Sequence, residues 1–153
     1  MLNPNDIEKI KKITKEFFQK TTFDVEIEIL PKKEETLPIN LKAEDPQILI
    51  GERGQTLNEI QHLLKLILRR KIEEPFYIDL DINDYKKKKI EYLKDLARSL
   101  ADEVSLTKNE KELSPMSAYE RRIIHLELAG RTDITTESIG QEPERRVVIR
   151  PRP

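Results

Sequence analysis

Apolar residues in the first half of the chain change their spacing repeatedly, and each change predicts a new element. After Asn5 or Asp6, either of which can cap a helix, apolar residues recur at helical spacing over residues 7–18. Residues 23–29 and 37–43 then alternate between apolar and other side chains, which is typical of strands with one buried face. The charged turn between these two strands predicts that they form a hairpin.

A glycine-containing loop interrupts the pattern after the second strand. A short apolar turn at 47–50 leads into Gly51-Glu52-Arg53-Gly54, and a long helix begins just beyond this loop. The helix ends near Glu73-Glu74-Pro75, and residues 76–82 alternate again as a third strand. The core-facing positions of the helix, and the two that widen its apolar stripe, are Leu57, Ile60, Leu64, Ile67 and Leu68, with Leu63 and Leu66. The predicted order is helix, strand, strand, short helix, Gly-x-x-Gly loop, helix, strand.

The second half of the chain begins with another long helix. Asn83-Asp84 is suited to cap it, and its apolar residues fall on one side at helical spacing. Ser117 and Glu120 have the spacing of a capping box, which predicts a further helix that Gly130 ends.

Short strands flank that further helix. Residues 111–116 predict one strand before it, and residues 134–139 and 145–150 predict a pair after it, joined by a Gly-Gln-Glu-Pro turn. We therefore expect an α+β fold with two domains, 1–83 and 84–153.

Charge and composition narrow the class of protein. The 153 residues carry a net charge of −1, but residues 1–83 hold 13 basic and 16 acidic side chains, whereas residues 84–153 hold 15 and 13. A nucleic-acid site must therefore be a local patch. The absence of cysteine excludes disulfides, thiolate zinc sites and cysteine nucleophiles. No window reaches the roughly 18 apolar residues of a membrane span and the amino terminus lacks a signal-peptide core, so we expect a cytoplasmic protein without membrane insertion.

The glycine loop, Ile50-Gly51-Glu52-Arg53-Gly54-Gln55, is the first candidate site. Two glycines ahead of a helix let the backbone approach a ligand and direct free amides toward phosphate, and Arg53 adds a cation. An isolated Gly-x-x-Gly is more often a plain tight turn. Here two of only four glycines stand in one loop inside the element order described above, which favours a binding loop.

This combination resembles the type II KH fold, with the order helix-strand-strand-helix-helix-strand. In that family the loop clamps the backbone of about four nucleotides and an apolar groove receives the bases. By resemblance the groove or its floor consists of Ile48, Leu49, Ile50, Gln55 and Leu57. Glu52 departs from the pattern, since a basic or small residue would suit phosphate better, and this acid weakens binding or pairs with Arg53. The outward positions of the predicted sheet form an acidic face that nucleic acid should avoid: Asp24, Glu26, Glu28, Asp79 and Asp81.

A second candidate site lies in the predicted helix after Ser117. Arg121 and His125 are four residues apart, so they share one helix face and can meet one phosphate or base. Taken alone, a surface pair with a partly packed histidine is the commoner arrangement. The four lysines at 86–89 could attract phosphate, but a solvated first helical turn is the better interpretation.

The wider sequence around Arg121 and His125 resembles the Arg-xxx-His single-strand nucleic-acid-binding domain. The resemblance extends over Pro115-Met116-Ser117-Ala118-Tyr119-Glu120-Arg121-Arg122, Thr136-Glu137-Ser138 with Gly140, and Arg145 to Pro151. The order of a KH domain and then this domain resembles the bacterial Jag family (SpoIIIJ-associated, also KhpB or EloR), over essentially the whole chain. Members often have an additional amino-terminal domain, and because this sequence starts almost directly at the KH helix, we expect it to lack that domain.

What the Jag resemblance implies is a regulator or chaperone that binds single-stranded RNA, or single-stranded DNA, with links to cell elongation, division and sporulation. It also implies a small single-KH protein partner. The implied contacts in the second domain are Arg121 and His125, supported by Arg122, Arg145, Arg146 and Arg150. The alternative is a KH-based protein-interaction scaffold with little nucleic-acid binding. We expect no catalysis, metal or cofactor, because no paired carboxylates or nucleophile arrangement stands out.

Overall fold

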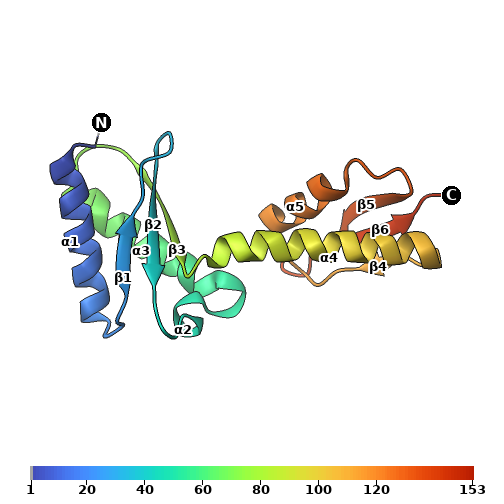
Figure 1. Cartoon of the computed structure of the whole chain (residues 1–153), viewed down its shortest axis with the longest axis horizontal. Coiled ribbons are helices and arrows are strands. Elements are labelled where there is room, and N and C mark those ends of the chain that lie inside the picture. The colour runs from blue at the N-terminus through green and yellow to red at the C-terminus, as the bar shows by residue number, and fades with distance from the viewer. Residues whose placement is uncertain (1) are drawn as a thin grey trace. The chain divides into compact units, whose positions relative to one another are not determined.

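A computed structural model describes residues 2–153, which divide into two compact units, one up to residue 86 and one from residue 87 onward. The first unit holds α1 (Pro4–Lys20), β1 (Glu26–Ile29), β2 (Thr36–Lys42), α2 (Gln47–Ile50), the 3-10 turn η1 (Glu52–Gly54), α3 (Gln55–Lys71) and β3 (Tyr77–Ile82) (Figure 1). The second holds β4 (Lys111–Glu112), α5 (Ala118–Leu128), β5 (Ile134–Ile139) and β6 (Arg146–Pro151), together with most of α4 (Tyr85–Thr107). This α+β architecture confirms the predicted fold class.

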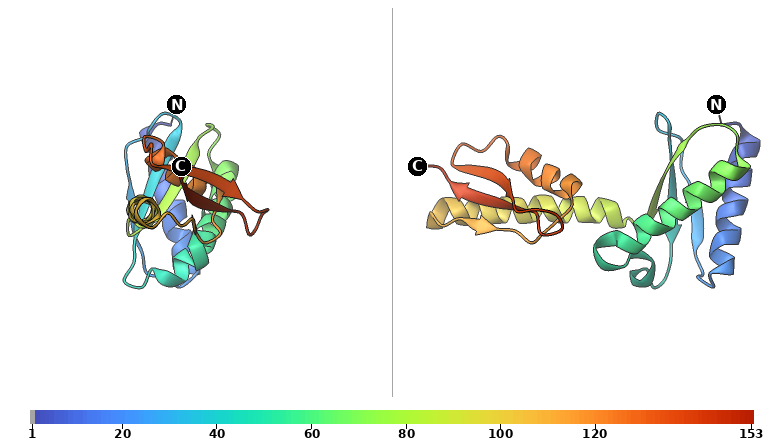
Figure 2. Two further views of the ribbon diagram at one scale, coloured as in Figure 1. Left: turned by 90° about the vertical axis from the view of Figure 1, so that its right-hand side faces the viewer. Right: turned by 180° about the vertical axis from the view of Figure 1, so that it is seen from behind.

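The first unit is a three-stranded sheet with two helices on one face (Figures 1 and 2). The strand order is β1-β2-β3, with β1 antiparallel and β3 parallel to β2. Ile39 lies at the centre, paired with Ile29 on one side and Leu80 on the other. Because side chains alternate along a strand, one face of β2 and β3 is buried under α1 and α3, and the other carries acids.

Helix α1 begins earlier than the sequence predicted. Asn3, and not Asn5 or Asp6, is the N-cap: its Oδ1 accepts a hydrogen bond from the Asp6 amide at 2.9 Å, and the Asp6 carboxylate accepts one from the Asn3 amide at 3.1 Å. The cap satisfies two amide donors, and Pro4 suits the first helical position because it has no N–H to satisfy.

Helix α3 buries a narrower stripe than predicted. Leu57, Leu64 and Leu68 are buried, but Leu63 and Leu66, which were expected to widen the stripe, are 48% and 49% exposed. The sheet covers only one side of the helix, so residues a quarter-turn away from the stripe remain in contact with solvent.

The turn between β3 and α4 differs from the predicted Asn83-Asp84 cap. Both residues adopt positive φ angles, 49° and 57°. The Asp81 carboxylate instead accepts from the Lys86 amide at 3.1 Å. The Asn83 side chain bonds both backbone groups of Ala43, at 3.0 and 2.8 Å, and so ties this turn to the end of β2.

The second unit packs α4 and α5 against one face of the sheet β4-β6-β5. The predicted capping box is present, since Ser117 Oγ accepts from the Glu120 amide and the Glu120 carboxylate accepts from the Ser117 amide. The strand predicted at 111–116 is only Lys111–Glu112. Pro115 has no N–H to donate, so beyond the strand the segment is held to β6 by single bonds rather than by a continuous ladder.

Candidate nucleic-acid interface

The glycine loop between α2 and α3 is a tight bend whose conformation requires glycine. Gly51, Arg53 and Gly54 have φ angles of 70°, 54° and 79°. A Cβ on Gly51 would lie 2.1 Å from Thr56 Oγ1, and a Cβ on Gly54 would lie 3.0 Å from the ring of Tyr85. The bend therefore needs glycine at both positions, for backbone freedom and for space.

Two backbone amides at this bend are free to bind a ligand. The Gly51 amide donates to the Gln47 carbonyl at 2.9 Å, and the Gly54 amide donates to Gly51 at 3.4 Å. Within residues 2–153, the amides of Glu52 and Arg53 donate no hydrogen bond, and the two exposed side chains form no ion pair with each other or with any other group. Free amides and an unpaired guanidinium at the start of a long helix suit a phosphate.

The predicted groove residues divide between surface and core. Ile48 is 61% exposed beside the bend, whereas Leu49 and Leu57 are almost fully buried. Ile50 is partly buried, and the exposed Gln55 donates to Glu59 at 3.1 Å. Ile48 is thus the apolar side chain that a base could contact, while Leu49 and Leu57 support the bend from below.

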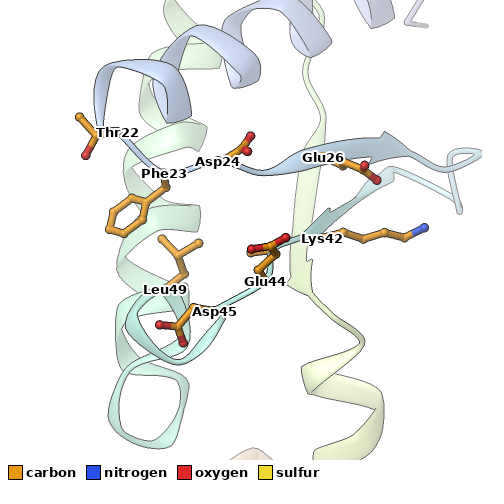
Figure 3. A pocket seen from close by; sticks show the side chains of 9 residues that line it. Thr22, Phe23, Asp24, Glu26, Lys42, Glu44, Asp45 and Leu49 are labelled. Atoms are coloured by element: carbon orange, nitrogen blue, oxygen red, sulfur yellow. The ribbon is translucent and has the colours of Figure 1, made fainter.

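A pocket of about 530 Å³ lies where the starts and ends of the first unit's elements meet, with Phe23 and Leu49 near one another (Figure 3). Its rim carries Asp24, Glu26, Glu44 and Asp45 with Lys42 as the one cation of the lining. Such a rim repels phosphate, in agreement with the predicted acidic face of the sheet.

Two acids of that predicted face are occupied by other contacts. Asp79 forms an ion pair with Lys86 at 2.5 Å, and Asp81 accepts from the Lys86 amide. Lys89 lies 3.7 Å from Glu120. The lysine run is therefore not a wholly solvated first turn, because its first and last members are paired.

Arg121 is a buried structural residue in this fold. Its side chain is 9% exposed, and its Nη1 donates to the Met116 carbonyl at 2.7 Å and to Glu142 Oε1 at 2.9 Å. These bonds join the start of α5 to the β5–β6 turn. The prediction that Arg121 and His125 together meet one phosphate therefore does not match the described conformation, in which the guanidinium is already bound.

His125 is held between two hydroxyl groups of β5. Its Nδ1 lies 2.8 Å from Thr136 Oγ1, and its Nε2 lies 2.8 Å from Ser138 Oγ. Burial, followed by the nearby Arg121 guanidinium, lowers the pKa of His125 below its ordinary value. The imidazole is therefore neutral at pH 7 and contributes no positive charge to a phosphate site.

The supporting arginines fall into two groups. Among the described residues, Arg122 and Arg145 have no carboxylate partner, although Arg145 donates to the Gly140 carbonyl at 2.8 Å. Arg146 pairs with Glu112 at 2.6 Å. Arg150 pairs with Glu110 at 2.9 Å and also with Glu137. With Arg53 added, we call Arg53, Arg122 and Arg145 the unpaired arginines.

The partners of the two central residues were missing from the predicted site. Glu142 holds Arg121, while Thr136 and Ser138 hold His125, and all three come from β5 or the turn that follows it. The capping box and the strand alternation place these segments next to α5, but they do not indicate which side chains meet. Among residues 2–153 no cluster of metal-binding side chains is present, and no helix has the length and apolarity to cross a membrane.

Comparisons with known proteins find a family for each part of the chain. Residues 7–80 match the family model of the KhpA/KhpB KH domain, and residues 91–151 match that of the Arg-xxx-His domain. The chain is similar to RNA-binding protein KhpB of Clostridium symbiosum, at 40% identity over 116 residues that cover 76% of this chain and 52% of the relative. It is 38% identical over 120 residues to RNA-binding protein KhpB of Bacillus subtilis (strain 168), covering 77% and 58%.

A more distant relative extends the match over nearly all of the chain. RNA-binding protein KhpB of Streptococcus pneumoniae serotype 2 is 28% identical over 147 residues, which are 94% of this chain and 45% of that protein. The chain spans about half the length of these curated relatives. It is therefore a protein with a KH domain followed by an Arg-xxx-His domain. The chain belongs to the Jag/KhpB family, which confirms the resemblance drawn from its motifs.

Proposed function

We propose that this protein binds single-stranded RNA, with the Gly51–Gly54 bend as the primary backbone grip. The observation that carries the proposal is the exposed bend with two free amides and the unpaired Arg53 beside them. The names of the relatives, which call them RNA-binding proteins, support the choice of RNA. The site residues in this proposal are the loop 50–55 and the unpaired arginines.

The biological role in this proposal is that of a post-transcriptional regulator or RNA chaperone in the cytoplasm. The KH model that the chain matches is shared by KhpA and KhpB, which supports a small single-KH protein as a partner. Neither unit is proposed to be catalytic. Magnesium and labelled RNA incubated with the purified protein should give no cleavage, and steady cleavage that disappears in His125→Ala would overturn this part.

Arg53→Asp tests the grip directly. The substitution removes the cation beside the free amides and places a carboxylate there, so affinity for a short single-stranded RNA should fall about tenfold, which equals about 1.4 kcal/mol. Arg69→Asp is the matched control, because Arg69 is also exposed but lies in the last turn of α3, away from the bend. Its affinity should stay within about twofold of the wild type.

The fold of both variants is checked by circular dichroism and the affinity by anisotropy of labelled RNA. A well-folded Arg53→Asp variant that binds as the wild type does would exclude the grip. If the wild-type chain itself shows no binding to RNA, the protein-interaction scaffold becomes the better description of its function.

A further inference from the structure

One face of α5 is exposed and has no partner in the described part of the chain. Tyr119, Arg122 and Leu126 stand at positions i, i+3 and i+7 and so share one side of the helix. Tyr119 and Leu126 are each 65% exposed, and Arg122 is exposed as well. The opposite side of α5 is the buried one, with Ile124 and Leu128 in the core. We call Tyr119, Arg122 and Leu126 the α5 platform.

The charges around the α5 platform favour an anionic ligand. Arg122 forms no ion pair with any of the residues from 2 to 153. The two acids that flank the platform along the helix are already neutralised, Glu120 by Lys89 at 3.7 Å and Glu127 by Arg98 at 2.6 Å. The platform therefore presents one uncompensated positive charge between an aromatic ring and an aliphatic side chain.

We propose that the α5 platform binds one nucleotide, with an unpaired base stacked on the Tyr119 ring and its phosphate against Arg122. Side chains three positions apart on a helix have Cβ atoms roughly 5–6 Å apart, so ring and guanidinium can reach one nucleotide together. Leu126 adds an apolar contact to the same base or its sugar. This inference rests on the proposed RNA-binding function and places the second contact on the outer side of α5, away from the buried Arg121.

The chain has no tryptophan, so a single introduced tryptophan reports on this site alone. In the full chain, Tyr119→Trp should retain binding, and its fluorescence should be quenched when an unlabelled single-stranded RNA of about 12 nucleotides is added, because the indole stacks on a base. Tyr92→Trp is the control, since Tyr92 is 59% exposed on α4 in the same unit. Its emission should remain unchanged at RNA concentrations that saturate binding.

Affinity measurements with labelled RNA complete the test. Tyr119→Ala should weaken binding about 5- to 30-fold, whereas Tyr119→Phe, which keeps the ring, should bind within about twofold of the wild type. If RNA binds the wild-type chain but Tyr119→Trp is not quenched and Tyr119→Ala binds normally, the platform proposal is overturned while RNA binding through the glycine bend stands; that result would leave a protein partner as its occupant. If Arg53→Asp and Tyr119→Ala both bind as the wild type does, both proposals fail.

Discussion

The two adjacent arginines of α5 should have separate roles, and exchanging one for alanine at a time tests this. Arg121→Ala removes a buried guanidinium that bonds the Met116 carbonyl at 2.7 Å and the Glu142 carboxylate at 2.9 Å. Hydrogen bonds that involve a charged group contribute about 1.5–3 kcal/mol, and Glu142 can return to water because its side chain is 61% exposed. We therefore expect a loss of about 2–3 kcal/mol in the free energy of unfolding of the second unit.

That loss corresponds to a fall of about 10–20 °C in melting temperature for a unit of this size. Arg122→Ala removes an exposed side chain without an ion-pair partner, so the melting temperature should change by no more than about 3 °C. The effects on RNA affinity should be reversed. Below its melting temperature Arg121→Ala should bind RNA normally, whereas Arg122→Ala should bind several-fold more weakly and lower the salt slope by about 0.7.

Thermal melts and amide hydrogen exchange of α5 give the stability, and RNA titrations between low and moderate salt give the slope. The reasoning would be refuted if Arg121→Ala left the exchange rates of α5 unchanged while reducing the affinity for RNA. Arg121 would then contact the ligand, and its bond to Glu142 would be a resting contact that RNA replaces.

Three further predictions concern charge, glycine and histidine. The log of RNA affinity should fall with the log of salt concentration at a slope near −2, since each of the unpaired arginines contributes about 0.7; a slope of −4 or steeper would show that paired cations also reach phosphate. Gly51→Ala should disrupt the bend and abolish most RNA binding, as NMR shifts of the loop and titrations would show, whereas Gly130→Ala has open space for its Cβ and should bind normally. Because the folded pKa of His125 is lowered, the unfolded chain binds more protons just below pH 6.5, so stability should fall as pH falls through that range. Denaturation midpoints at pH 7.5 and 5.5 measure this, and His125→Gln should reduce the difference; an undiminished difference would assign it to other groups.

Local patterns predicted most of the fold. The alternation at 134–139 gave the bounds of β5, and Ser117 and Glu120 form the predicted capping box. The errors occurred where a long-range contact competes with a local rule. Asp81 takes the place that Asn83 and Asp84 were expected to have at α4, because the parallel pairing of β3 fixes where the chain turns.

The candidate site was predictable in its backbone and less so in its charges. The glycine bend follows from the spacing of Gly51 and Gly54 ahead of an apolar-periodic helix. Four phosphate contacts and a slope near −3 were the expectation from sequence. Which arginines are free depends on neighbours 34 or 40 residues away, as for Arg146 with Glu112 and Arg150 with Glu110, and no local spacing encodes such pairs. The burial of Arg121 likewise depends on the β5–β6 turn.

The outer side of the second sheet shows how such pairs can shape recognition. Val148 is fully buried although it points away from the main core, and its strand neighbours are Glu112 and Glu137. The side chains of Arg146 and Arg150 follow it on the same side of β6, where their paired heads screen each other and their methylene stems shield the valine from water. Three glutamates thus restrain the pull of this surface on polyanions. Each one replaced by glutamine would leave an arginine less fully neutralised, so a few substitutions could convert an inert wall into an adhesive one without altering the hydrophobic interior.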